Sequence, residues 1–158
     1  MALTHQGAIF GISTTPITPT LDLTAFEALT YEFSTGKGVV TAPSFSVAQN
    51  ILTQNTLDTQ IAEKQVGVAS GEDSELTMSH RAATDVLVTA LNAAARSQNI
   101  FGVSYELNDS LGANGTTYFA AAILGGGGGP VGGGVEDFAN LRWSISLTHQ
   151  YPVIKAAA

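Results

Sequence analysis

The strict alternation of apolar and polar residues near the end of the chain constrains the fold more than any other feature. Leu141, Trp143, Ile145 and Leu147 alternate there with Arg142, Ser144, Ser146 and Thr148. Successive side chains of a β-strand point to opposite faces, so the pattern predicts a half-buried strand over residues 141–151. Shorter strand-like runs occur at residues 7–12, 29–33, 75–80, 100–107 and 116–124. We therefore expect a mainly β domain.

Turn-forming residues connect some of these runs. Asn108-Asp109-Ser110 and Ala113-Asn114-Gly115 separate residues 100–107 from residues 116–124. Asn, Asp and Gly favour turns, so these two runs are predicted to pair as an antiparallel hairpin. Residues 13–23 contain Pro16 and Pro19 and are predicted to form a turn-rich connection.

One segment has a helical pattern. Leu87, Ala90, Leu91 and Ala94 form a single apolar stripe at helical spacing. Thr84-Asp85 supplies an N-cap and Arg96 suits the last turn, so a helix is predicted over residues 86–98. A single helical turn capped by Thr24 is a second, shorter candidate.

Two segments fit neither pattern. Residues 39–56 are rich in Thr, Ser, Asn and Gln and almost free of charge, and connections of this length are usually functional. We expect an extended arm or long hairpin there. Residues 125–134 hold eight Gly around Pro130 and Val131, which predicts a flexible loop between two strands. With these two features, residues 1–158 are expected to form one antiparallel β domain carrying one helix.

The chain carries unusually little charge. Only 12% of its residues are charged, against roughly 25% in a typical soluble domain. A surface of small polar groups can be buried against copies of the same chain, since interface cores are depleted in charge. A weakly charged monomer or an extracellular β domain fits the composition equally well. The net charge of −7, with six Lys and Arg, excludes tight neutralisation of nucleic-acid phosphates.

The sequence offers no recognisable catalytic or cofactor site. It has no Cys, and His5, His80 and His149 are far apart without metal-ligand spacing. The glycine run lacks the Lys-Ser or Lys-Thr of a phosphate loop. No signal peptide and no apolar run of membrane-spanning length are found. We expect a soluble, non-enzymatic protein made in the cytoplasm, with no metal, no cofactor and no membrane insertion.

A series of short motifs occurs in an order that suggests a family. It comprises Asn55-Thr56-Leu57-Asp58-Thr59, Lys64 and Gly67, Gly71-Glu72-Asp73, Leu76-Thr77-Met78, a helix from Asp85, Tyr105-Glu106-Leu107-Asn108, and Glu136-Asp137-Phe138 before a strand through Trp143. The N-terminal stretch through Ala25-Phe26-Glu27-Ala28-Leu29-Thr30-Tyr31 adds to the series. In this order the chain resembles the major tail tube protein of siphophages and gene transfer agents, a phage tail tube family.

The resemblance implies a β-sandwich or barrel flanked by a helix, closing into hexameric rings that stack around a lumen. Double-stranded DNA would pass through without specific binding. Tape measure, tail terminator and distal tail proteins would be further partners, in a virion tail assembled in the host cytoplasm. The arm would mediate ring stacking through Val47, Gln49, Asn50, Leu52, Gln54 and Asn55. Asp58, Glu72, Asp73 and Glu106 are candidates for inter-subunit or lumen positions.

Two other classes remain open. The chain could be the tube protein of a contractile injection or type VI secretion system, which shares the architecture and would bind a contractile sheath. It could instead be a virion decoration or binding domain, which would be monomeric or trimeric and bind a glycan or capsid. An enzyme is the least favoured class, because no catalytic constellation is present.

Overall fold

The computed structural model describes residues 3–58, 60–82, 84–109 and 114–157. The strands are β1 Ile9–Pro16, β2 Tyr31–Phe33, β3 Val39–Thr41, β4 Val47–Gln54, β5 Glu63–Gly71, β6 Asp73–Ser79, β7 Phe101–Glu106, β8 Thr117–Gly125, β9 Asn140–Leu147 and β10 Val153–Lys155. The helices are α1 Leu23–Glu27 and α2 Val86–Ser97. The mainly antiparallel β fold expected from the sequence is confirmed, with two short helices instead of one.

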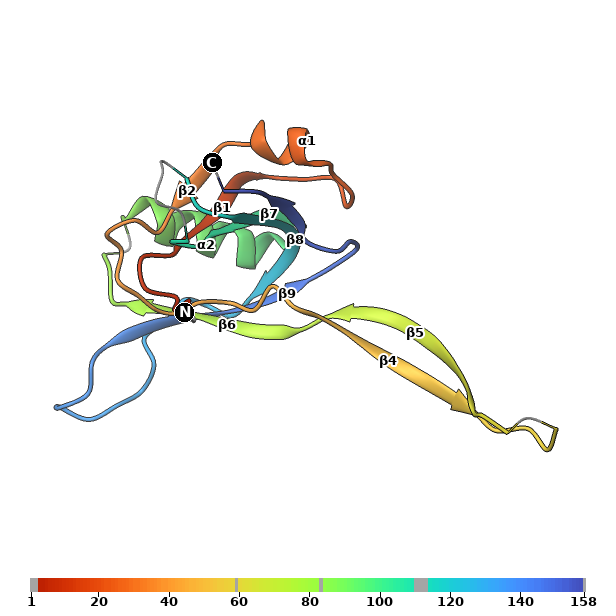
Figure 1. Cartoon of the computed structure of the whole chain (residues 1–158). Coiled ribbons are helices and arrows are strands. Elements are labelled where there is room, and N and C mark those ends of the chain that lie inside the picture. Colours follow the sequence, from red (N-terminus) through yellow and green to blue (C-terminus); the bar gives the residue numbers. More distant parts are fainter. Residues whose placement is uncertain (1–2, 59, 83, 110–113, 158) are drawn as a thin grey trace.

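The main sheet runs in the order β2-β1-β7-β8-β9-β6-β3, and β10 pairs with β8 beside this path. Strand β8 lies between β7 and β9 and pairs with both. Its residues 117–122 pair with β7, whereas its residues 122–125 pair with β9. The predicted hairpin of β7 and β8 is confirmed by this pairing, although Ser110 and Ala113 of its predicted turn lie outside the described residues. The sheet, α1 and α2 together are called the body (Figure 1).

The core lies between the curved sheet and α2. Trp143 is fully buried at its centre, and its indole Nε1 donates a hydrogen bond to Asn92 on α2 at 3.1 Å. The predicted alternation of β9 is confirmed, since Leu141, Trp143, Ile145 and Leu147 are all buried there. Burying one such large side chain is worth roughly 1.5–3 kcal/mol relative to exposure, so this face dominates the stability of the body.

Helix α2 begins and ends at identifiable caps. Asp85 accepts hydrogen bonds from the backbone N–H groups of Leu87 and Val88, which satisfies donors that the first turn leaves free. Lys37 pairs with the Asp85 carboxylate at 2.7 Å and joins the helix start to the β2–β3 connection. Gln98 ends the helix in the left-handed conformation.

The second face of the sheet is covered at its centre by α1. Phe26 of α1 stacks on Phe119 of β8 with ring centroids 5.7 Å apart, and Tyr31 lies against the same Phe119 ring. Strands β7 and β8 are therefore buried on both faces, which explains why β7 is buried over nearly its whole length. Strand β9 and the adjoining β6 have no such cover and keep one exposed face.

Some local predictions were wrong. Strand β1 continues to Pro16, within the predicted turn region, and Pro16 pairs with Phe101 after a register shift. Proline has no backbone N–H to donate to a neighbouring strand, and it is tolerated in strands at irregularities such as this register shift. Helix α1 is capped by Asp22 rather than Thr24, because the Asp22 carboxylate accepts from the N–H of Ala25. The predicted 141–151 strand ends at Leu147, and β10 was not foreseen.

Candidate assembly surfaces

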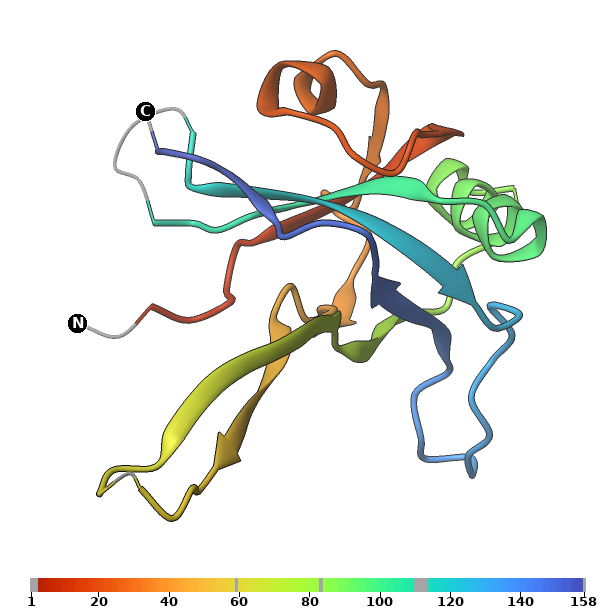
Figure 2. The ribbon, with the colours of Figure 1, turned by 90° about the vertical axis from the view of Figure 1, so that its right-hand side faces the viewer.

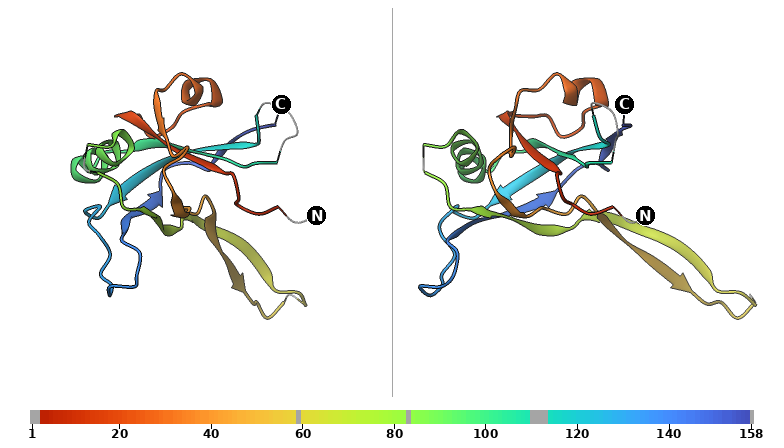
Figure 3. Two further views of the ribbon diagram at one scale, coloured as in Figure 1. Left: turned by 90° about the vertical axis from the view of Figure 1, so that its left-hand side faces the viewer. Right: turned by 60° about the vertical axis from the view of Figure 1, so that its left-hand side comes forward.

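Strands β4 and β5 form a separate two-stranded hairpin that leaves the body, as Figures 1 and 3 show. We call residues 47–71 the arm. The arm was predicted to span residues 39–56, and both limits were wrong. Residues 39–41 form β3 and belong to the main sheet, whereas residues 63–71 are the returning strand β5. Of the two expected forms, an extended arm or a long hairpin, the structure has the hairpin, whose return strand β5 lies outside the predicted range.

The arm contains a β-bulge near its middle. Gln49 pairs with Ala69 and Ile51 pairs with Val66, so Asn50 stands opposite two residues of β5. The Gln49 side-chain amide donates a hydrogen bond to the carbonyl oxygen of Gly67 at 2.9 Å. This bond links the two strands where the bulge interrupts their backbone pairing. A bulge adds twist and makes an exposed hairpin a poorer template for unwanted strand pairing.

The arm exposes apolar side chains on both of its faces. Ile51, Leu52, Val66 and Val68 are between 59% and 91% exposed. Ile51 and Val66 lie opposite each other and share one face, whereas Leu52 points to the other. No described residue of the arm is buried. A two-stranded hairpin by itself is marginal in water, and this arm is exposed or half-buried along its described length.

The root of the arm is held firmly. Gly71 approaches the backbone of Leu147 so closely that no Cβ could fit there. Glu72 accepts a hydrogen bond from the Ser44 hydroxyl at 2.9 Å, and its N–H donates to the Ser46 carbonyl. These contacts fix the direction in which the arm leaves the body.

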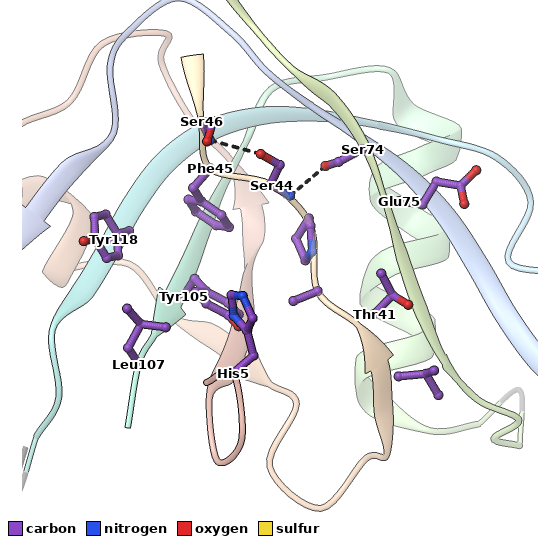
Figure 4. Close-up of a pocket in the computed structure, with 13 residues that line it drawn as sticks. His5, Thr41, Ser44, Phe45, Ser46, Ser74, Glu75, Tyr105, Leu107 and Tyr118 are labelled. Atoms are coloured by element: carbon purple, nitrogen blue, oxygen red, sulfur yellow. Dashed lines mark hydrogen bonds between the residues drawn. The ribbon is translucent and has the colours of Figure 1, made fainter. Parts of the chain in front are cut away.

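The chain enters the arm past an open hollow of about 960 Å³ (Figure 4). Phe45 packs there against Tyr105, with ring centroids 5.7 Å apart. The Tyr105 hydroxyl lies 2.6 Å from Nδ1 of His5, which ties the N-terminal segment to the same ring. This cluster anchors residues 42–46 on the body, and its lining offers no catalytic arrangement.

The β8–β9 connection, residues 126–139, forms a second projection (Figures 1 and 2). The sequence predicts a flexible loop here, and the structure shows packing contacts at its base. Gly128 has φ +60° and lies against the Trp143 ring, where a Cβ would meet ring atoms at 2.7 Å. Val131 donates its N–H to the Asn140 carbonyl at 2.8 Å. At Gly128, glycine is needed for close packing and positive φ.

The end of this loop is a turn, and we call residues 134–138 the loop tip. The Asp137 carboxylate accepts from the N–H of Gly134 at 2.7 Å, and the N–H of Asp137 donates back to the Gly134 carbonyl. Val135 and Phe138 are 104% and 90% exposed. The loop tip therefore displays two apolar side chains beside two carboxylates, Glu136 and Asp137.

The exposed face of β6 and β9 is polar and weakly charged. Asp73, Glu75, Ser144 and Ser146 lie there, with Arg142 paired to Glu75 at 3.4 Å. The pair is about half exposed and contributes little to stability.

The ten residues expected to form assembly contacts lie in different parts of the structure. Val47 is half-buried at the arm root, and the other five stacking candidates are exposed along the arm and just beyond it: Gln49, Asn50, Leu52, Gln54 and Asn55. Asp58 lies at the far end of the arm, next to Thr59, which is outside the described residues. Glu72 is at the arm root and Asp73 begins β6. Glu106 is half-buried at the end of β7 and accepts from the N–H of Gly115.

Sequence reasoning missed two groups of exposed apolar residues. Neither Val66 and Val68 of β5 nor Val135 and Phe138 were expected to be contact residues. Val66 and Val68 flank a single Gly, and this local pattern was the available signal for a strand with a bulge. The exposure of Val135 and Phe138 had no such signal, because each is a single apolar residue in a short turn.

Several ionisable groups have pKa values that are shifted by their surroundings. In the part of the chain that the structure describes, no three His, Asp or Glu side chains gather as metal ligands. Burial raises the pKa of the Tyr31 and Tyr105 phenols. Hydrogen bonds from Lys37 and Thr116 lower the pKa of Asp85 and Asp109, respectively. No helix among the described residues is long and apolar enough to cross a membrane.

Solved structures that are similar to this chain include chains from contractile injection systems. A chain of the sheath–tube complex of the extracellular contractile injection system PVC, in its extended state, matches with a TM-score of 0.64 and 10% identity, over 99% of this chain and 93% of that chain. A chain of the PVC sheath/tube terminator matches with a TM-score of 0.60 and 11% identity, over 99% and 98% of the two chains. The fold is tail-tube-like.

A third match comes from the baseplate of the anti-feeding prophage, with a TM-score of 0.55 and 10% identity, over 99% of this chain and 96% of that chain. No protein-family model matches the sequence, and no curated protein matches it. At these identities the likeness concerns the fold, and it extends over the whole chain, arm and loop included.

Proposed function

We propose that this chain is a tube-forming structural subunit of an assembly like a contractile injection system. Its copies close into rings, and the rings stack into a hollow tube. The observation that carries the proposal is the arm: a twisted hairpin with apolar side chains on both faces and no buried residue of its own. In a tube, the arm is covered by neighbouring copies.

Ring closure follows from the edges of the main sheet. Strands β2 and β3 end the sheet on its two sides, and each pairs over only three residues or fewer. Short edges can pair with a neighbouring copy in a head-to-tail contact, and such a contact closes a ring when the rotation allows it. We propose six copies per ring and a lumen lined by the polar face of β6 and β9.

The contractile system is favoured over the siphophage tail, because the similar structures come from assemblies with a sheath or a sheath/tube terminator. The partners we propose are therefore a contractile sheath and a terminator. A siphophage tube that conducts double-stranded DNA is the second candidate, supported by the net charge of −7, which would repel phosphate from the wall. Tape measure and distal tail proteins would be partners in either case.

Electron microscopy of the purified chain over a concentration series tests the proposal. We expect rings or hollow tubes at high concentration. A variant in which residues 50–68 are replaced by Asn-Gly keeps the Gln49–Ala69 pair and a short hairpin. This variant should fold and form rings but no tubes. A wild-type chain that stays monomeric at every concentration contradicts the proposal.

Co-sedimentation separates the two candidates. Tubes of this chain should bind a contractile sheath subunit encoded beside it and pull it into the pellet. If such tubes instead bind no sheath protein and occur only in DNA-filled particles, the siphophage candidate replaces the contractile one.

A further inference from the structure

The arm and the loop tip lie at opposite ends of one strand pair. Strands β6 and β9 are antiparallel and paired along their whole length, from Asp73 opposite Ser146 to Ser79 opposite Asn140. The arm enters β6 at its Asp73 end, and the loop of residues 126–139 enters β9 at its Asn140 end. At ~3.3 Å per residue the two attachment points are about 20 Å apart. A copy shifted along this ladder would bring its loop tip towards the arm of the first (Figure 1).

The loop tip needs a partner with both an apolar surface and a positive charge. Val135 and Phe138 are almost fully exposed, and Glu136 and Asp137 stand between them. Glu136 has no ion-pair partner among the described residues. Cations are scarce in this chain, so the positions of its six Lys and Arg residues restrict the choice.

Four of these six cationic side chains already have an ion-pair or hydrogen-bond partner within the chain. Lys37, Arg142 and Lys155 form ion pairs with Asp85, Glu75 and Glu27, and Arg81 donates to the carbonyl oxygens of Lys37 and Gly36. Among the described contacts, Lys64 and Arg96 have neither kind of partner. Arg96 lies in the last turn of α2, and the exposed apolar residue of that helix, Val86, is about 15 Å away at its other end.

Lys64 has the surroundings that the loop tip requires. It pairs with Thr53 in the arm, two residues from the Ile51–Val66 pair, so all four side chains share one face. This face presents two exposed aliphatic side chains beside an exposed cation. It complements the loop tip in both hydrophobicity and charge.

We propose that the loop tip of one copy docks on the Lys64 face of the arm of the next copy along the tube. The contact is heterologous, joining two different surfaces of identical chains, so it repeats without closing and drives stacking. It assigns the glycine-rich loop the role of receptor for the arm. This inference rests on the proposed tube function and names the surface that the arm recognises.

Disulfide trapping in the full chain tests the contact directly, because the natural sequence has no Cys. In the double variant Val66→Cys/Val135→Cys, oxidation should link copies into covalent multimers larger than dimers. The two positions lie at opposite ends of the β6–β9 ladder, far beyond the ~7 Å limit between Cα atoms for a disulfide within one chain. Either single variant should give dimers at most, and so should the matched control Val66→Cys/Ile154→Cys.

Charge exchange provides an independent readout. Lys64→Glu and Glu136→Lys should each lower the yield of tubes by at least about tenfold, because a loss of up to roughly fivefold at each contact accumulates over the contacts of a ring. The double variant should recover the wild-type yield to within about twofold. Arg96→Glu, which makes the same charge change away from the contact, should leave the yield unchanged.

The outcomes separate this inference from the function on which it rests. If wild-type and all charge variants form tubes equally well and no multimers are trapped, the loop tip has another partner and the inference is overturned while the tube function stands. If the wild-type chain forms neither rings nor tubes, the proposed function and the inference fall together.

Discussion

The body and the arm are both antiparallel β structure, yet they are stabilised differently. The body buries Trp143, Phe10 and Ile12 completely between its sheet and α2. The arm has the same strand geometry but no buried side chain among its described residues, and it leaves Ile51 and Leu52 in water. One chain is enough to specify the body. The arm exposes apolar side chains that its own chain does not bury.

This comparison predicts that substitutions in the body reduce folding stability, whereas substitutions in the arm reduce assembly. The largest expected effect is in the centre of the core. Trp143→Ala removes the largest buried side chain and its hydrogen bond to Asn92, which should lower the free energy of unfolding by about 3–5 kcal/mol. Urea denaturation of the monomer measures it. A loss below about 1 kcal/mol would mean that the core is not organised around this ring.

The loop base should behave as part of the body. Gly128→Ala places a Cβ against the Trp143 ring at a residue with φ +60°, which should cost about 1–3 kcal/mol by strain and overpacking. Gly127→Ala is the matched control, because its Cβ would meet nothing within 4 Å. Equal melting temperatures for the two variants would show that the loop base is not packed as described.

The cap of α2 should contribute less. Asp85→Ala removes the acceptor for the N–H groups of Leu87 and Val88, which should cost about 1 kcal/mol. Asp85→Asn keeps an acceptor but loses the charge that Lys37 faces, so its loss should be smaller. Thermal unfolding at neutral pH ranks the three proteins, and an order other than wild type, Asn, Ala would contradict this role.

The Asp85 carboxylate should also make the folding stability depend on pH. The hydrogen bond from Lys37 lowers the pKa of Asp85, so the ionised form is favoured in the folded state. Its contribution is present above the unfolded pKa of about 4 and is lost as pH falls through the lower folded value. The stability difference between wild type and Asp85→Asn should therefore shrink below about pH 4. A difference that stays constant down to pH 2 would rule out the linkage.

The smallest effect on folding is expected in the arm. Ile51→Ser and Leu52→Ser should each change monomer stability by less than about 0.5 kcal/mol, since both side chains are already in water. Each should still reduce tube formation, because the two residues lie on opposite faces of the arm. Ile154→Ser on β10 is the exposed control. If only one of the arm variants impairs assembly, the arm docks by one face alone.

The body could largely be predicted from the sequence because its signals are local. The alternation through Trp143 and the stripe from Leu87 to Ala94 record which side of each element faces the core, and the structure confirms both. The pairing of β7 with β8 followed from the turn residues between them. These patterns exist because the chain itself provides the buried surface.

The arm and the loop could be predicted only in part, for the same reason. Residues 63–71 mix charged, polar and glycine residues, and their strand is defined by pairing with β4 rather than by a core. The position of Gly128 against Trp143 depends on two segments meeting in space. The cap of α1 was misassigned because Asp22 and Thr24 are both good capping residues, and the backbone geometry decides between them.

Hydrogen–deuterium exchange of arm amides, measured in dilute monomer and in assembled tubes, tests the central claim most directly. Body amides in β7, β8 and α2 should be protected in both states. Amides of β4 and β5 should exchange rapidly in the monomer and become protected in the tubes, because neighbouring copies then cover the arm. An arm that is equally protected in the monomer, or one that exchanges just as fast in the tubes, would contradict the account.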